Sequence, residues 1–185
     1  MKPIYLRNIP PPPETFDHIE MLKMYAKWIK PERYLELGVR SGAAFLKIAP
    51  YCKEAHAVDM LDVKFRLGKN MTFHKNSTDD YFAQLDKDVQ FDMIFIDADH
   101  SFEQSCRDFV NAAKHIIMDG FIFLHDTYPY DPEMFKPEWC HDAYKTPLWI
   151  KQNMIDDFEI ITLPFNPGLT IAKKMKRNKQ LEYLD

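Results

Sequence analysis

Strand-like and helix-like segments alternate five times along this chain of 185 residues, and the alternation limits the folds that it can adopt. Short apolar segments predict five strands, at residues 34–39, 55–60, 71–75, 91–97 and 121–125. Apolar residues at helical spacing predict helices near residues 16–29, 41–50, 78–85, 101–117 and 142–154. Two closing strands, at 158–163 and 169–173, flank a Pro-Gly turn. The pattern predicts an α/β fold: a doubly wound, mostly parallel seven-stranded sheet with an antiparallel C-terminal hairpin.

One domain over residues 1–185 is expected, because the length suits a single hydrophobic core and no internal repeat is present. Residues 1–13 contain a run of prolines and are expected to form an extended lead-in to this domain.

Small polar residues and glycine predict where several helices begin and end. Ser41 is expected to cap the second helix, and Ser101 with Gln104 has the spacing of a capping box for the fourth. Gly120 suits the C-terminal cap of that fourth helix.

Charge and cysteine content narrow the class of partners. The net charge of -4 at pH 7 argues against nucleic acid and against anionic membranes. No stretch is apolar and long enough to cross a bilayer, and the first residues lack a signal-peptide pattern. Three widely spaced cysteines without a CxxC pattern indicate reduced, mostly buried thiols. We expect a cytoplasmic protein, and a homo-oligomer stays open.

A glycine turn follows the first predicted strand. Two of only five glycines, Gly38 and Gly42, fall in it, and glycine lets a ligand approach the backbone closely. The turn reads G-x-x-x-G and has Arg40 where a dinucleotide fingerprint has a tightly packed glycine, which argues against nicotinamide cofactors. The alternative is a tight turn that binds no ligand.

Acidic and imidazole side chains end the fourth and fifth strands: Asp97, Asp99, His100, His125 and Asp126. Ligands of open α/β sheets bind at the carboxyl ends of the strands, so these residues should face the same crevice as the glycine turn. This arrangement predicts an enzyme. His100 is the first candidate for a general base, because the ordinary pKa of histidine is near neutral, and Asp99 is the second. The alternative is that Asp99 and His100 only cap the next helix.

The motif E-x-G-x-x-x-G at residues 36–42, followed by an acidic end to the second strand, resembles the class I S-adenosylmethionine-dependent methyltransferases. The resemblance implies a Rossmann-like methyltransferase fold with S-adenosylmethionine as cofactor. Asp59 lies about 20 residues beyond the glycines, where a carboxylate can bind both ribose hydroxyls. The resemblance assigns further cofactor contacts to Glu36, Gly38, Gly42, Asn76 and Asp97.

Residues 91–103 and 120–127 resemble the small-molecule O-methyltransferase branch, which includes sugar and macrolide-glycoside methyltransferases. This resemblance implies transfer of a methyl group to a hydroxyl of a small acceptor, such as a sugar or a glycosylated metabolite. Related sugar methyltransferases also place a histidine three residues after the metal-binding acid, as His100 follows Asp97 here.

A divalent ion, Mg²⁺ or Mn²⁺, is implied by metal-dependent relatives, whose ligand positions match Asp97 and Asp126. His125 stands at a ligand position that is usually acidic. As a ligand it would shift the preference toward Mn²⁺, Fe²⁺ or Zn²⁺, and otherwise it is not a ligand. Thr127 stands where catechol-type relatives carry Asn, which argues against that subfamily. The alternative for Asp97 and Asp126 is a pair of acids without a metal.

Two other functions stay open. One is a methyltransferase-fold module that binds a ligand or partner without catalysis. The other is a metal-dependent enzyme of another class that uses Asp97, His125 and Asp126. The aromatic residues of the loop at 127–139 would either form a lid or acceptor wall, or pack on the neighbouring helix.

Overall fold

A seven-stranded sheet forms the centre of the protein, whose computed structural model describes residues 17–175. The strand order is β3-β2-β1-β4-β5-β7-β6, and β7 runs antiparallel to both of its neighbours, β5 and β6. The bounds are Arg33–Leu37 (β1), Glu54–Asp59 (β2), Met71–Lys75 (β3), Phe91–Ile96 (β4), Ile116–His125 (β5), Phe158–Leu163 (β6) and Leu169–Lys174 (β7). The predicted fold class is confirmed. The lead-in at 1–13 lies outside the described residues.

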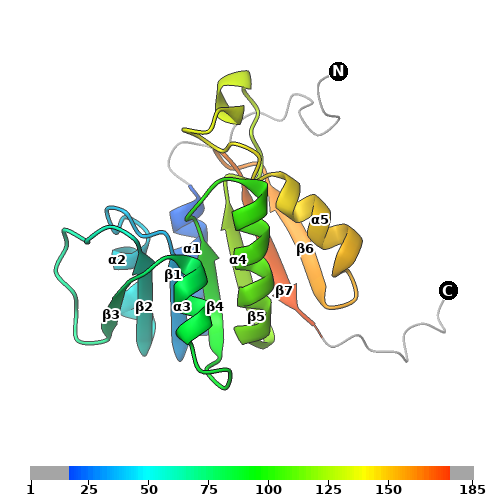
Figure 1. The fold of residues 1–185 in the computed structure, drawn as a ribbon. Helices are drawn as coiled ribbons and strands as arrows, with labels where there is room; N and C mark the ends of the chain where they lie inside the picture. The colour runs from blue at the N-terminus through cyan, green and yellow to red at the C-terminus, as the bar shows by residue number, and fades with distance from the viewer. Residues whose placement is uncertain (1–16, 176–185) are drawn as a thin grey trace, which may run out of the picture.

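Helices cover both faces of this sheet, as Figure 1 shows: α3, α4 and α5 lie on the near face, and α1 and α2 lie behind it. Each layer of helices buries its own cluster of apolar side chains against the sheet. The helices span His18–Ile29 (α1), Phe45–Ile48 (α2), Thr78–Gln84 (α3), Phe102–His115 (α4) and Lys145–Asn153 (α5), with short 3₁₀ turns at Ala49–Tyr51 (η2) and Pro132–Phe135 (η3). No helix within residues 17–175 has the length and apolar character needed to cross a membrane.

The two central strands, β1 and β4, are almost entirely buried on both faces because helices pack on both sides of them. The chain leaves β1 for β2 and β3 on one side, and then returns to pair β4 with the other edge of β1. This reversal creates a switch point at the carboxyl ends of β1 and β4, where α/β folds bind ligands. The fold therefore directs attention to the residues just after Leu37 and Ile96.

Backbone contacts at the switch point are very close. Gly38 has φ +80°, and its N–H donates to the carbonyl of Val58 in β2. A Cβ on Gly38 would lie 2.2 Å from the carbonyl oxygen of Asp97. Only glycine fits this position, because a side chain would clash with backbone atoms that cannot move aside.

Two of the predicted helix ends are wrong. The turn after β1 continues to Ala44, so α2 begins at Phe45 and Ser41 makes no capping hydrogen bond to it. The helix α4 ends at His115 because Ile116 has extended backbone angles, and Gly120 lies inside β5 rather than at a helix end. The capping box is confirmed in its first half, since the N–H of Gln104 donates to Ser101 Oγ.

Replacing Gly38 by Ala should destabilise the fold strongly, because it combines a left-handed backbone with a backbone clash. We expect a loss of about 3 kcal/mol or more in the free energy of unfolding, measured by urea denaturation. The control is Gly68→Ala, where the nearest atom is the flexible side chain of Met71 at 3.3 Å. Equal stabilities for the two variants would contradict the close approach of β1 to the end of β4.

Candidate functional site

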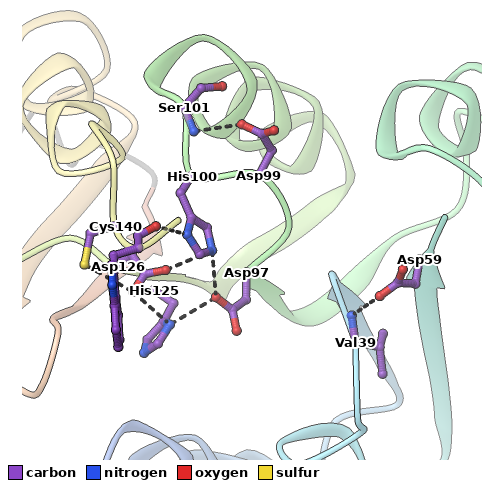
Figure 2. A network of polar contacts seen from close by, with 10 residues as sticks. Val39, Asp59, Asp97, Asp99, His100, Ser101, His125, Asp126 and Cys140 are labelled. Carbon is purple, nitrogen blue, oxygen red and sulfur yellow. Dashed lines mark hydrogen bonds and ion pairs between the residues drawn. The ribbon is translucent and has the colours of Figure 1, made fainter. Parts of the chain in front are cut away.

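Two carboxylates and two imidazoles meet at the carboxyl ends of β4 and β5 (Figure 2). His100 Nε2 lies 2.9 Å from Asp126 Oδ2 and 3.9 Å from Asp97 Oδ1. His125 Nδ1 lies 3.0 Å from Asp97 Oδ1 and 3.4 Å from Asp126 Oδ1. The structure therefore brings together four of the five predicted residues at these strand ends, and we call Asp97, His100, His125 and Asp126 the acid–imidazole cluster.

Asp126 is held in an unfavourable backbone conformation at the centre of this cluster. Its φ is 58°, in the left-handed region that costs a non-glycine residue roughly 1–3 kcal/mol. Its side chain is buried, and the thiol of Cys140 donates to Oδ1 at 3.5 Å. The surrounding contacts compensate for the strain and fix the direction of the carboxylate.

A loop that we call the strap, residues 127–144, crosses the cluster after β5. The carbonyl oxygen of Trp139 accepts a hydrogen bond from His100 Nδ1. Further along the strap, Asp142 Oδ1 accepts from the N–H of Phe102 at 2.6 Å, at the start of α4. Because the carbonyl of Trp139 can only accept, Nδ1 of His100 carries a proton and Nε2 faces the two carboxylates.

The charges of the cluster favour a protonated His100. Burial opposes the charged imidazole, but the hydrogen bond and the negative charge of Asp126 outweigh it and raise the pKa of His100 to about 9. Burial likewise opposes the charged form of Asp126, but His100 and His125 lower the pKa of that carboxyl below its ordinary value. The pair is thus an imidazolium–carboxylate ion pair, as long as no other cation engages Asp126.

A cleft of about 240 Å³ opens beside the cluster, between the glycine turn and α3. It contains four of the predicted residues, Gly38, Asp59, Asn76 and Asp99. Sequence reasoning missed the other lining residues, which are Val58, Met60, Ser77, Thr78, Asp79, Ala98 and Gln104. Ser77 is the N-cap of α3, and the sequence could have predicted this position, because Ser three residues before an acid is a helix-start signal.

Asp59 holds the glycine turn in place. Its Oδ2 accepts a hydrogen bond from the N–H of Val39 at 3.0 Å (Figure 2). The same oxygen accepts a second one from the N–H of Arg40 at 2.8 Å. Arg40 has φ 49°, and the hydrogen bond to Asp59 favours this left-handed conformation in a residue other than glycine. Asp59 therefore shapes the turn as well as lining the cleft.

Glu36 and Gly42 do not line the cleft. Glu36 is 2 % exposed and accepts a hydrogen bond from the hydroxyl of Tyr34 at 2.6 Å. Gly42, with φ +79°, packs under the ring of Phe65, which would lie 2.6 Å from a Cβ there. Their direct contact with a cofactor stays a prediction, and the structure gives both residues a part in building the turn.

Asp99 points away from the cluster and into the wall of the cleft. Its carboxylate accepts from the N–H of Ser101 at 2.7 Å, and hydrogen bonding to the side chain and the backbone of Ser101 lowers the pKa of Asp99. The contact is a local turn just before α4, whose N-cap is Ser101 and not Asp99 or His100. A role for Asp99 as a base stays a prediction, and its position favours His100.

The cluster has the donor set of a divalent-metal site. Among the described residues, one ligand atom each from Asp97, His100 and Asp126 fall within 4.8 Å of one another. Two carboxylates and one imidazole suit Mn²⁺, Fe²⁺ or Zn²⁺ as well as Mg²⁺. His125 is not in this set; its Nδ1 lies 3.0 Å from Asp97 Oδ1, and its Nε2 is buried without a hydrogen-bond partner among the described residues.

Known proteins share this fold. Residues 35–127, half of the chain, match the family model described as a methyltransferase domain. No curated protein matches the chain by sequence. The chain is similar to a methyltransferase from Podospora anserina bound to S-adenosylhomocysteine, with a TM-score of 0.67 and 16 % identity, over 85 % of this chain and 78 % of that one.

Two further solved structures are similar over most of their length. The O-methyltransferase TomG from Streptomyces achromogenes, in complex with S-adenosylmethionine, has a TM-score of 0.64 and 15 % identity, over 85 % of this chain and 79 % of that one. An O-methyltransferase from Bacillus cereus, in complex with S-adenosylhomocysteine, has a TM-score of 0.64 and 14 % identity, over 88 % and 82 %. Identities this low show a common fold.

The buried carboxyl of Glu36 should make stability fall as pH rises. Burial raises its pKa from 4.5 to about 8, so the folded chain holds a proton that the unfolded chain releases in this interval. Relative to Glu36→Gln, the wild type should lose up to about 1.4 kcal/mol of stability per pH unit between these values.

Urea denaturation at a series of pH values measures this difference. The matched control is Glu32→Gln, whose side chain is 69 % exposed. A stability difference between wild type and Glu36→Gln that stays constant over the interval would rule out a buried, protonated Glu36.

Proposed function

The chain belongs to the family of methyltransferase domains, and we propose that it transfers the methyl group of S-adenosylmethionine to a hydroxyl of a small molecule. One observation carries this proposal: the segment from Asp97 to His100 borders two sites at once. Ala98 and Asp99 line the cleft, whereas Asp97 and His100 belong to the acid–imidazole cluster. A methyl donor in the cleft would lie directly beside groups that can bind and deprotonate a hydroxyl.

The cleft supports the cofactor part of the proposal. Gly38 leaves the backbone open to a ligand at the switch point, and Asp59 and Asn76 place polar atoms along the same cleft. The N–H groups of Val39 and Arg40 already occupy Asp59 Oδ2, so the carboxylate is fixed in direction before a ribose hydroxyl arrives. Solved structures of this fold with S-adenosylmethionine or S-adenosylhomocysteine bound agree with such a use.

A divalent cation, Mg²⁺ or Mn²⁺, is the second part of the proposal, and Asp97 and Asp126 would hold it with His100 or His125 nearby. When bound, such a cation supplies positive charge that lowers the pKa of an acceptor hydroxyl. The strained, buried Asp126 supports this use, because strain at a non-glycine residue concentrates at functional sites.

His100 would accept the hydroxyl proton at Nε2. The carbonyl of Trp139 keeps the other proton on Nδ1, so the lone pair of a neutral His100 points toward Asp97 and Asp126. While Asp126 pairs with His100 alone, that lone pair carries a proton. A cation at the carboxylates would compete for Asp126 and release His100 as a base.

A sugar or glycosylated metabolite is the proposed acceptor class. The strap presents the side chains of Trp139, 58 % exposed, and Tyr130, 42 % exposed, along the loop that crosses the cluster. Exposed aromatic rings can pack against the apolar faces of sugar rings. The net charge of -4 argues against nucleic acid as the acceptor.

Calorimetric titration with S-adenosylhomocysteine tests the cofactor site. We expect micromolar affinity for the wild type, and a loss of about tenfold or more in Asp59→Asn, since a hydrogen bond to a charged group contributes about 1.5–3 kcal/mol. The control is Asp62→Asn, an exposed acid three residues on that pairs with Lys75. Failure of the wild type to bind the nucleoside, together with metal binding, would favour a metal-dependent enzyme of another class.

Replacing His100 by Ala distinguishes a role as general base from a role as metal ligand. As a base, His100→Ala should lower turnover of a sugar or glycoside acceptor by about 10²–10⁴-fold and leave the affinities for S-adenosylhomocysteine and Mn²⁺ close to those of wild type. Asp97→Ala should abolish Mn²⁺ binding, and His141→Ala, an imidazole in the strap outside the cluster, is the control.

The same variants identify the competing roles. Loss of Mn²⁺ affinity in His100→Ala would reassign this residue as a ligand. Cofactor binding without turnover of any acceptor by the wild type would favour a non-catalytic binding module.

A further inference from the structure

His18 is a third imidazole at this site, in contact with the acid–imidazole cluster, and no local sequence pattern marks it. It is the first residue of α1, after the N-cap Asp17. Its ring centroid lies 3.9 Å from that of His125, with the ring planes tilted by 42°. Phe95 of β4 lies 6.2 Å from both rings. A helix from the far side of the sheet thus packs a side chain directly on the cluster.

His125 has only one end of its ring held by hydrogen bonds. Its Nδ1 bonds Asp97 Oδ1 at 3.0 Å, whereas its Nε2 is buried and has no hydrogen-bond partner among the described residues (Figure 2). The torsion that turns an imidazole about its bond to Cβ is broad, so a single hydrogen bond does not fix the plane of the ring. Ring packing must supply the rest, and the ring in closest contact is that of His18.

The orientation of His125 matters because it sets that of Asp97. The carboxylate of Asp97 has His125 Nδ1 as its nearest charged or polar side-chain partner, at 3.0 Å, with His100 Nε2 at 3.9 Å. A partner that fixes a ligand's direction typically changes metal affinity by about 10–100-fold when it is removed. Packing on His125 can therefore change the metal affinity of Asp97 and Asp126 without contacting the metal.

A hydrogen bond from His18 Nδ1 plays no part in the contact between the two rings. His18 Nδ1 is buried without a hydrogen-bond partner in the described part of the chain, which costs stability rather than adding to it. An aromatic ring without nitrogen would pack on His125 equally well. The contact therefore depends on the packing of the two rings. An aromatic replacement of His18 should keep His125 in place, and a small replacement should not.

We propose that His18 is a positioning residue, which packs its ring on His125 and thereby fixes the imidazole that orients Asp97. This inference deepens the proposed function, since it concerns the same metal-holding carboxylate. His18→Phe should preserve the arrangement, and His18→Ala should release it.

Long-range ¹H–¹⁵N correlation spectra of the imidazoles test the proposal without metal or substrate. In the wild type and in His18→Phe, His125 should give the signals of one fixed state with Nδ1 protonated; the signals are assigned with His125→Gln. In His18→Ala, the His125 signals should shift and broaden, because the ring is no longer held in one orientation. The control is His56→Ala, whose imidazole lies on β2 and contacts Phe91 at the other end of the sheet.

Metal titration supplies the second readout. His18→Ala should bind Mn²⁺ about 10–100-fold more weakly than wild type and S-adenosylhomocysteine equally well, and His18→Phe should match wild type for both. Unchanged His125 signals in His18→Ala, or changed signals in His18→Phe, would overturn the proposal. If the wild type binds no Mn²⁺, the metal part of the proposed function fails, and the spectra still decide the role of His18.

Discussion

The approach of the glycine turn to the end of β4 is the contact on which the rest of the site depends. Gly38 packs so tightly on the backbone of Asp97 that no side chain fits between them. The N–H of Asp97 also donates to the carbonyl of Leu37, so a hydrogen bond joins the ends of β1 and β4 next to this contact. Because one short segment after β4 carries both a cleft wall and a cluster carboxylate, a change in this contact would move both sites together.

The acid–imidazole cluster depends on groups that come from distant parts of the chain. The strap contributes the carbonyl of Trp139 to His100 and the thiol of Cys140 to Asp126. From the opposite face of the sheet, α1 contributes the ring of His18 to His125. Strong opposite charges in a half-buried site need such supports, because burial alone disfavours every charged form in it. The cluster thus depends on two further segments, the strap and α1, which pack around the two strand ends.

Much of the fold followed from the sequence, because strand and helix periodicity and the chain's alternation specify a parallel sheet and its switch point. The meeting of Asp97 with Asp126 followed from the same rule, since both end neighbouring parallel strands. The wrong helix ends have local causes: the turn at Gly42 extends beyond Ser41, and Ile116 adopts the extended conformation that its branched side chain favours. Trp139 and His18 were missed because their contacts join residues far apart in the sequence, and no local pattern marks them.

We propose that a methyl donor and a metal-held hydroxyl meet at the end of β4. A crystal structure of the protein with S-adenosylhomocysteine and Mn²⁺, with anomalous data collected at the manganese edge, tests it most directly. We expect one strong anomalous peak between the carboxylates of Asp97 and Asp126, with the nucleoside in the cleft beside Gly38 and Asp59. Manganese elsewhere on the protein, or the nucleoside outside this cleft, would contradict it.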